Sequence, residues 1–254
     1  RDGVVRAASF EKGILVSDVT EKTSDENGTF VSFTPDNSLF RNYEYRAAYV
    51  ETLLRNYTYL NTGLTIMFNG KRILSRNGLA DLLTDNMTAD ALYPIIHLKG
   101  TDIEIAFTHA QQYGEEYYSF VNGQHTSQGG THQSAFKELV AQTIHDFFSA
   151  KNFEYCDIRN GIVAAIAINI QEPVFESQTK VRLGSTTIAP DPGSMSVKKF
   201  ISDFVKEELD NFLHKNPEIS DVMLSKIMAS EKERKELAGL TKQVREKAKK
   251  VNMH

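Results

Sequence analysis

The run GIVAAIAINI, residues 161–170, constrains the fold more than any other stretch of this chain. Nearly every position in it is apolar, and it is bounded by Gly161 and by the Glu172-Pro173 break. A short apolar run without alternation is typical of a strand that is buried on both faces. The run therefore predicts a β-strand with no face left to the solvent.

Several other segments carry the patterns of strands and turns. Residues 1–34 predict short strands, the last of them in GTFVSFTPD, which stops at a Pro-Asp turn signal. Asn69-Gly70, between two short apolar stretches, predicts a tight hairpin. The stretch DIEIAFTHA alternates and predicts a half-buried strand, and EEYYSFVN, which follows it, predicts the hairpin partner of that strand.

Helical spacing of apolar residues appears in five places. Residues 43–60 predict a helix whose buried face includes Tyr49, Leu53 and Tyr57, and a short helix near 79–83 has Asn77 as its expected cap. A longer helix is expected from about Gln133. Its apolar stripe consists of Phe136, Leu139, Val140, Ile144 and Phe147. After APDPGS come two further helical segments. The first is expected to bury Phe200, Ile201, Phe204, Val205, Leu209 and Phe212. The second, from about residue 217 to 250, is more polar.

The totals exclude several classes of protein. With 254 residues and a net charge of -4, the chain is large enough for one large or two modest domains and is not coated in basic charge. Its single cysteine excludes an internal disulfide and favours the cytoplasm, and no apolar stretch is long enough to span a membrane. Because it opens RDGVVRAASF, with neither a methionine nor a signal segment, we expect it to begin partway through a longer protein.

The loop SFVNGQHTSQGGTHQSAF, residues 119–136, has three interpretations. Glycines before a helix expose amides that suit a phosphate, although GGTH matches no established phosphate motif. His125 and His132 lack the short spacing of zinc ligands, so a histidine hydrogen-bonded within the protein is the simpler account. Gly129 and Gly130 can instead provide a turn with positive φ, with Thr131 capping the helix.

Cys156 has no catalytic signature around it, and we expect it to be a small buried residue.

The stretch ESQTKVRLGS follows the apolar run and contains Gln178, Thr179 and Lys180. A lysine on a short polar loop is suited to a phosphate because it is a point charge on a flexible stem. Most lysines, however, are simply solvated at the surface, and spacing alone leaves this alternative open.

The order of these segments resembles one family, the B subunits of bacterial type IIA DNA topoisomerases, and within it topoisomerase IV more than gyrase. The resemblance covers nearly the whole chain. It rests on NGTFVSFTPD, YEYRAAYVETLLRNYTYLNTGLTIMF, FVNGQHTSQGGTHQSAF and DIRNGIVAAIAINIQEPVFESQTKVRLGS. The combination of G-G-T-H with a later Q-T-K is specific, although each motif alone is weak.

The resemblance implies an α+β fold in three parts. Residues 1–41 would be the last strands of a histidine-kinase/Hsp90-type ATP-binding domain. Residues 42–215 would be a transducer domain like domain 2 of ribosomal protein S5, a mixed sheet with helices on one face. Residues 216–254 would be a helical linker toward the cleavage (Toprim) region. It also implies an isomerase that couples ATP and Mg²⁺ to DNA strand passage, with DNA, an A-type cleavage subunit and a second B-type subunit as partners.

By the same resemblance, Gln178 and Lys180 would contact the γ-phosphate of ATP, with Lys180 stabilising the transferred phosphoryl group. Thr29 would lie at the adenine end of the pocket, and the G-G-T-H segment would be chiefly a structural turn. The family's catalytic glutamate, magnesium-binding asparagine and ATP lid have no match in this sequence, so we expect the isolated chain to be inactive and to bind no cofactor alone. Gly123 and Asn160 also depart from the family pattern. The alternatives are a stand-alone nucleic-acid-binding module and an independent ATPase or kinase.

Overall fold

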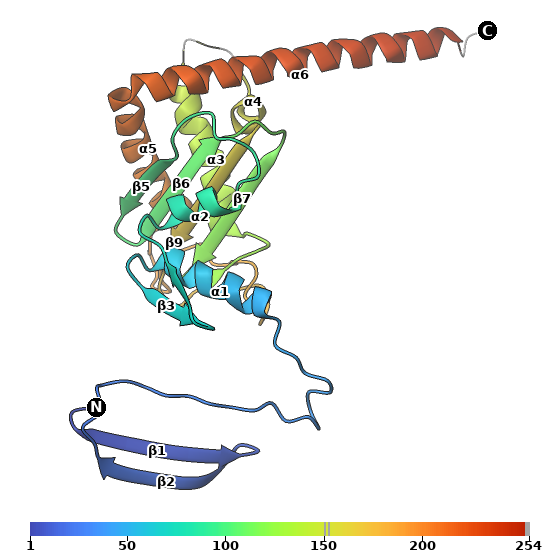
Figure 1. Cartoon of the computed structure of the whole chain (residues 1–254). Coiled ribbons are helices and arrows are strands. Elements are labelled where there is room, and N and C mark those ends of the chain that lie inside the picture. The colour runs from blue at the N-terminus through green and yellow to red at the C-terminus, as the bar shows by residue number, and fades with distance from the viewer. Residues whose placement is uncertain (150, 152, 252–254) are drawn as a thin grey trace. The chain divides into compact units, whose positions relative to one another are not determined.

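The computed structural model describes residues 1–149, 151 and 153–251, which form two compact units, Arg1–Val50 and Glu51–His254. Figure 1 labels the elements of both units. Within the described residues, no helix is both long enough and apolar enough to cross a membrane.

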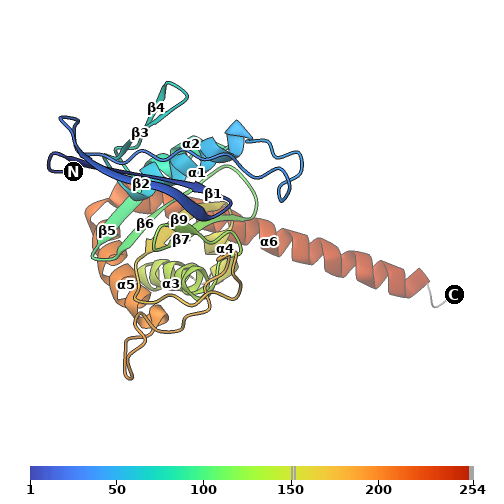
Figure 2. The same ribbon diagram turned by 90° about the horizontal axis from the view of Figure 1, so that it is seen from below.

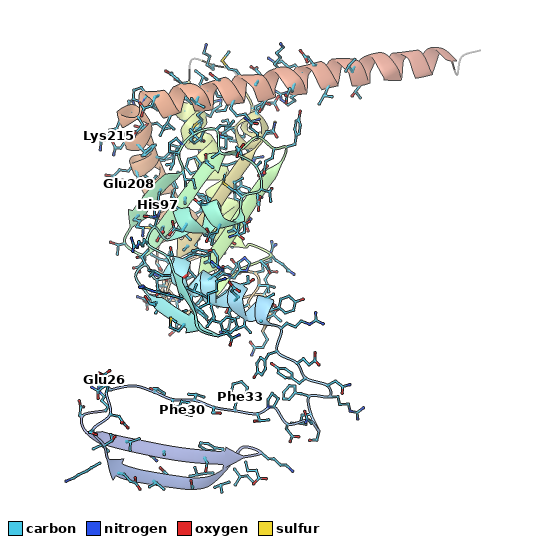
Figure 3. The ribbon with its side chains drawn as sticks, viewed as in Figure 1. Glu26, Phe30, Phe33, His97, Glu208 and Lys215 are labelled. Carbon is cyan, nitrogen blue, oxygen red and sulfur yellow. The ribbon has the colours of Figure 1, made fainter. Side chains whose placement is uncertain are left out.

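The first unit is built around one antiparallel hairpin, β1 (Val4–Glu11) and β2 (Ile14–Lys22). Lys12 and Gly13 both have positive φ, as a two-residue turn that matches the twist of its strands requires. The sequence GTFVSFTPD, by contrast, forms no strand, so that prediction was wrong. Phe30 is 90% exposed and Phe33 is 70% exposed, so burial against a sheet does not hold this segment in a strand (Figure 3).

Helix α1 (Ala47–Leu60) contains the boundary between the two units and differs from the helix expected over residues 43–60. Tyr49, Leu53 and Tyr57 are exposed, whereas the buried residues are Thr58 and Tyr59. The Tyr59 hydroxyl donates a hydrogen bond to Asp85, 2.6 Å away. Apolar spacing showed that a helix forms here, but tyrosines tolerate solvent, and the spacing did not reveal which face packs.

The second unit contains a mixed five-stranded sheet. Its spatial order is β5 (Ile96–Gly100), β6 (Ile103–His109), β9 (Ile162–Ile168), β7 (Glu115–Val121) and β8 (Gln124–His125). Strand β9 is the apolar run, and it is buried on both faces as predicted. It pairs antiparallel with β6 and parallel with β7.

Because β9 lies between β6 and β7, those two strands are not hairpin partners, and that prediction was wrong. The strand with two apolar faces takes the centre, where both faces can be covered. Strand β6 is also more deeply buried than the half-buried strand expected, because it lies beside β9. The real hairpin partners are β5 with β6 and β7 with β8.

Helices cover both faces of the sheet, not one face as expected (Figure 2). Ile105 and Phe107 of β6 face α3 (Thr131–Phe147) and α5 (Val197–Lys215), and the stripe expected on α3 packs there. Ala106 of β6 faces α2 (Leu79–Asn86) and Tyr59 on the other side. Since β9 is apolar on both faces, an uncovered face would expose it to water.

Helices α2 and α5 differ in detail from the expectations. The N-cap of α2 is Gly78, with no side-chain cap, and Asn77 instead donates hydrogen bonds to Asp81. On α5 the fully buried residues are Val197, Ile201, Val205, Leu209 and Leu213. Its three phenylalanines are only partly buried against the core.

Four remaining elements complete the second unit. The Asn69-Gly70 turn joins β3 (Thr65–Phe68) to β4 (Lys71–Leu74), as predicted, and both turn residues have positive φ. The short helix α4 (Tyr155–Arg159) leads into β9, and the long helix α6 (Pro217–Val251) ends the described chain.

Candidate functional site

Lys180 lies at the tip of a short hairpin in the long connection between β9 and α5. Phe175 and Leu183 form a bridge at the base of this hairpin, and the Glu176 amide donates to the Arg182 carbonyl at 3.1 Å. At the tip, the Lys180 amide donates to the Ser177 carbonyl at 3.0 Å, and Lys180 has a φ of 55°. This combination is typical of a three-residue hairpin loop whose last residue is left-handed.

The side chains of Gln178 and Lys180 are exposed at this tip. Across the described part of the chain, neither side chain makes a hydrogen bond or ion pair. The nearby hydroxyls of Ser177 and Thr179 bond to each other at 2.7 Å. The hairpin therefore presents one amide and one unpaired ammonium group to the solvent, a donor set that fits an anion such as a phosphate. We name residues 175–183 the lysine hairpin.

The lysine hairpin lies along the segment Gln128–Thr131 at the start of α3. The Gln128 amide donates to the Val181 carbonyl at 2.9 Å, and the Leu183 amide donates to the Gly129 carbonyl at 3.0 Å. The Thr131 amide then donates to the Leu183 carbonyl at 3.2 Å. The two motifs that the sequence separates by some fifty residues are thus joined by backbone hydrogen bonds. We name residues 128–131 the glycine segment.

Three of the four amides of the glycine segment donate to backbone carbonyls: those of Gln128, Gly129 and Thr131. The Gly129 amide donates to the Thr126 carbonyl at 2.8 Å, and the Thr131 amide is bound to Leu183. Both glycines have positive φ, as the turn interpretation requires. The expectation that Thr131 caps helix α3 was wrong. The N-cap residue of α3 is Gly130, and the Thr131 hydroxyl donates to the Ser185 carbonyl at 2.6 Å. With these donors occupied, the geometry favours a structural turn over a phosphate cradle.

His132 is fully buried behind the glycine segment. Its Nε2 lies 3.1 Å from the Thr126 hydroxyl, and its Nδ1 has no partner among the described residues. Burial lowers the pKa of His132 to about 4, because the charged ring would lose its hydration. The half-buried His125 ring stacks near Phe120, and burial lowers its pKa too. Among the described residues, no three His, Cys, Asp or Glu side chains cluster as metal ligands would.

Cys156 is exposed on α4, so the expectation that it is buried was wrong. It lies beside Glu154 and Asp157 on the solvent-facing side of the five-residue helix α4. Burial of the thiol, slight as it is, and these two carboxylates raise the pKa of Cys156. Such a thiol is a poor nucleophile at neutral pH.

Thr29, the residue expected at the adenine end of the pocket, belongs to the first unit. It is exposed and lies in an irregular segment outside β1 and β2. Gln178 and Lys180 share one hairpin of the second unit, so the structure brings these two expected site residues together.

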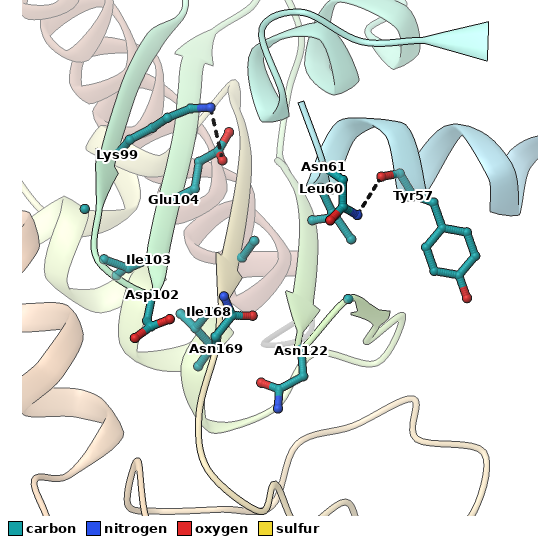
Figure 4. Close-up of a pocket in the computed structure, with 13 residues that line it drawn as sticks. Tyr57, Leu60, Asn61, Lys99, Asp102, Ile103, Glu104, Asn122, Ile168 and Asn169 are labelled. Carbon is teal, nitrogen blue, oxygen red and sulfur yellow. Dashed lines mark hydrogen bonds and ion pairs between the residues drawn. The ribbon is translucent and has the colours of Figure 1, made fainter. Parts of the chain in front are cut away.

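A groove of about 630 Å³ opens at the end of the sheet, lined by the ends of β7 and β9 and by the turn between β5 and β6 (Figure 4). Two of its charged residues pair with each other: Glu104 accepts a hydrogen bond from the Leu79 amide and lies 2.8 Å from His97 and 3.4 Å from Lys99. Burial raises the pKa of Glu104, but the His97 and Leu79 hydrogen bonds outweigh it and hold the pKa below its ordinary value. No sequence motif marked this groove.

Comparison with known proteins gives the family context. The model of the family described as DNA gyrase B matches residues 48–246. The chain is 36% identical over 253 residues to the B-type subunit of DNA topoisomerase 4 from Borreliella burgdorferi, covering 99% of this chain and 41% of that protein. It is 30% identical over 256 residues to the B-type subunit of DNA gyrase from Helicobacter pylori, covering 92% and 32%. The chain thus spans less than half the length of these relatives.

Solved structures show the same fold. The 43K ATPase domain of Thermus thermophilus gyrase B, solved with an aminocoumarin, matches with a TM-score of 0.74 at 22% identity, covering 96% of this chain and 69% of that one. The topoisomerase IV ATP-binding domain of Francisella tularensis matches with a TM-score of 0.66 at 22% identity, covering 92% and 67%.

Proposed function

Because this chain belongs to the DNA gyrase B family, we propose that it is the transducer part of the ATPase subunit of an ATP-dependent type II DNA topoisomerase. In that role it couples ATP binding and hydrolysis to the passage of one DNA duplex through another. Residues 42–215 form the transducer domain, of the ribosomal S5 domain 2 type. Residues 1–41 end an ATP-binding domain, and residues 216–254 lead to the cleavage region. DNA, an A-type cleavage subunit and a second B-type subunit are its partners.

The observation that carries this proposal is the unpaired ammonium group of Lys180 at the tip of an anchored hairpin. ATP with Mg²⁺ supplies the phosphoryl group that is transferred to water. Lys180 stabilises the negative charge that develops on that group, and the Gln178 amide helps to hold it. Thr29, in the other unit, is the residue that we assign to the adenine end of the ATP-binding domain's pocket. The amide and ammonium groups of this hairpin suit an anion, and among the described residues no three His, Cys, Asp or Glu side chains cluster as metal ligands would.

Coupling follows from the charge of Lys180. Bound ATP gives the ammonium group a partner, which favours the pose in which the lysine hairpin docks on the nucleotide. The shift between poses can be no larger than the difference in affinity of ATP for the two. The rigid connection from the sheet through α5 to α6 carries the change toward the cleavage region.

The test is ATP turnover by the full-length subunit with Lys180→Ala. Turnover falls by about 10³-fold, the scale on which a charge at a transferring phosphoryl group contributes. The matched control is Lys206→Ala on α5, another exposed lysine, which leaves turnover unchanged. Normal turnover in folded Lys180→Ala refutes the assignment.

A second experiment tests whether this chain supplies Lys180 while a separate N-terminal segment supplies the remaining catalytic residues. This chain alone is expected to show no ATP turnover, whereas a mixture with a separately produced N-terminal ATP-binding segment regains turnover that depends on Lys180. Turnover by the chain alone would place the catalytic residues within it and contradict the proposal.

A further inference from the structure

We infer that the glycine segment, and Gly130 above all, is a positioning element that fixes the lysine hairpin and thereby aims Lys180. This inference rests on the proposed function and deepens it. It assigns to the G-G-T-H motif a role beyond a turn into a helix, because the motif's backbone is one wall of the hairpin that carries the lysine.

The contact between Gly130 and Leu183 is close enough to require glycine. A Cβ atom at Gly130 would lie 2.4 Å from the Leu183 carbonyl oxygen, 2.5 Å from its nitrogen and 2.8 Å from its Cβ. All three atoms belong to the backbone or to the base of a buried side chain, since Leu183 is 1% exposed. They cannot swing aside as a flexible side chain does. Any side chain at Gly130 therefore pushes the hairpin away from α3.

Five hydrogen bonds make the attachment stiff. Two backbone hydrogen bonds join Leu183 to Gly129 and Thr131, and the Thr131 hydroxyl donates to the Ser185 carbonyl. Arg182 binds the Gln128 carbonyl at 3.2 Å and the Glu176 carboxylate at 2.8 Å, which ties the two arms of the hairpin to the glycine segment. Helix α3 is itself packed on the sheet, so the hairpin takes its position from the core.

This attachment matters because Lys180 has no partner of its own among the described residues. Its flexible side chain is aimed only by the backbone that carries it. Misplacement of a catalytic group by about 1 Å can cost 100-fold in rate. Displacing the hairpin at Leu183 therefore lowers catalysis without removing any group that touches the nucleotide.

The first test is hydrogen exchange of the 254-residue chain, which needs no nucleotide. Gly130→Ala is expected to speed exchange of the Leu183, Thr131 and Gln128 amides by at least about tenfold, because the bonds that protect them join the hairpin to the glycine segment and open. The control is Gly193→Ala, which also has a positive φ but no atom within 4 Å of the added Cβ. Unchanged exchange in folded Gly130→Ala overturns the inference.

The second test measures ATP turnover and nucleotide affinity in the full-length subunit. Gly130→Ala is expected to lower kcat by about 10- to 100-fold. ADP, which lacks a γ-phosphate, keeps its affinity. Thr131→Val, which removes only the hydroxyl bond to Ser185, gives a smaller loss of the same kind and serves if Gly130→Ala fails to fold. Wild-type kcat in both variants, while Lys180→Ala is inactive, overturns the inference and leaves the proposed function intact.

A double variant separates positioning from general damage. If the glycine segment acts only through the lysine, Gly130→Ala adds no further loss of turnover to Lys180→Ala. A further loss of tenfold or more would mean that Gly130 acts on the domain as a whole. Normal turnover in Lys180→Ala alone would instead refute the proposed function on which the inference rests.

Discussion

The buried histidine His109 makes the stability of the second unit depend on pH in a calculable way. Its Nε2 lies 2.6 Å from the Ile158 carbonyl oxygen, which can only accept, so Nε2 carries the proton. The Tyr93 hydroxyl, 2.6 Å from Nδ1, is then the donor to that nitrogen. Burial, with a smaller contribution from the charge of Lys226, lowers the pKa of His109 to about 4.

The sign of the effect follows from proton binding. In the unfolded chain His109 takes up a proton as pH falls below its ordinary pKa of 6.5, whereas in the folded chain it does not until about pH 4. Stability is therefore complete above pH 6.5 and is lost between pH 6.5 and pH 4. The shift is worth about 3 kcal/mol in full, of which about 2.5 kcal/mol is lost by pH 4.5.

The experiment compares wild type with His109→Gln by urea unfolding at pH 7.5 and pH 4.5, followed by far-UV circular dichroism. Glutamine can keep the hydrogen bond to Ile158 but does not titrate. The fall in unfolding free energy between the two pH values is expected to be smaller in His109→Gln by about 2.5 kcal/mol.

The control for this comparison is Ile144→Val, a core change on α3 that lowers stability by about 1 kcal/mol without altering any titrating group. Its fall with pH is expected to match that of wild type. If His109→Gln also falls as steeply as wild type, His109 is not the group that takes up the proton, and the reasoning fails.

Two predictions concern the junction of α4 and α6, where Arg234 binds the buried Asp157 carboxylate at 2.7 and 2.9 Å. Burial opposes ionisation of Asp157, but the interaction with Arg234 outweighs burial and holds the pKa of Asp157 below its ordinary value. Arg234→Met would leave this buried carboxylate unpaired. It is therefore expected to lower the stability of the fold at pH 7 and to speed hydrogen exchange in α4. That difference vanishes as pH falls through the pKa of Asp157, and the neighbouring Lys232→Met shows no such effect. The exposed Cys156 is expected to react with a thiol reagent in the folded chain, slowly at pH 7 and faster above pH 9, since its pKa is raised. Rapid labelling of Cys156 at pH 7 would contradict the conclusion that its surroundings raise the pKa of the thiol.

Local patterns in the sequence predicted much of the fold. The Asn69-Gly70 hairpin, the stripe of α3 and the buried strand β9 were correctly identified, because each depends on spacing or turn chemistry within a few residues. Which strands become neighbours depends on contacts between distant segments. The wrong pairing of β6 with β7 shows this, since β9 comes from some forty residues further along the chain.

The candidate site shows the same limit. The resemblance selected Gln178 and Lys180, and the structure shows them exposed on one hairpin, but their role stays a prediction. The contact between Gly130 and Leu183 gave no local signal, because a glycine that needs positive φ and one that needs close approach look alike in a sequence. Cys156 was misplaced because thiols are usually buried, and its short helix lies at the surface.

The central place of β9 also bears on how the chain is made. During synthesis β5, β6 and β7 emerge first, yet β6 and β7 share no hydrogen bonds and must wait for β9 to fill the space between them. Until residues 162–168 appear, the inner edges of both strands stay unpaired, and unpaired apolar edges are where nascent chains stick to one another. The crossover from β7 through α3 and α4 back to β9 adds non-local contacts, which slow folding. We therefore expect this sheet to form in a single late step, when its most apolar strand arrives and closes both edges at once.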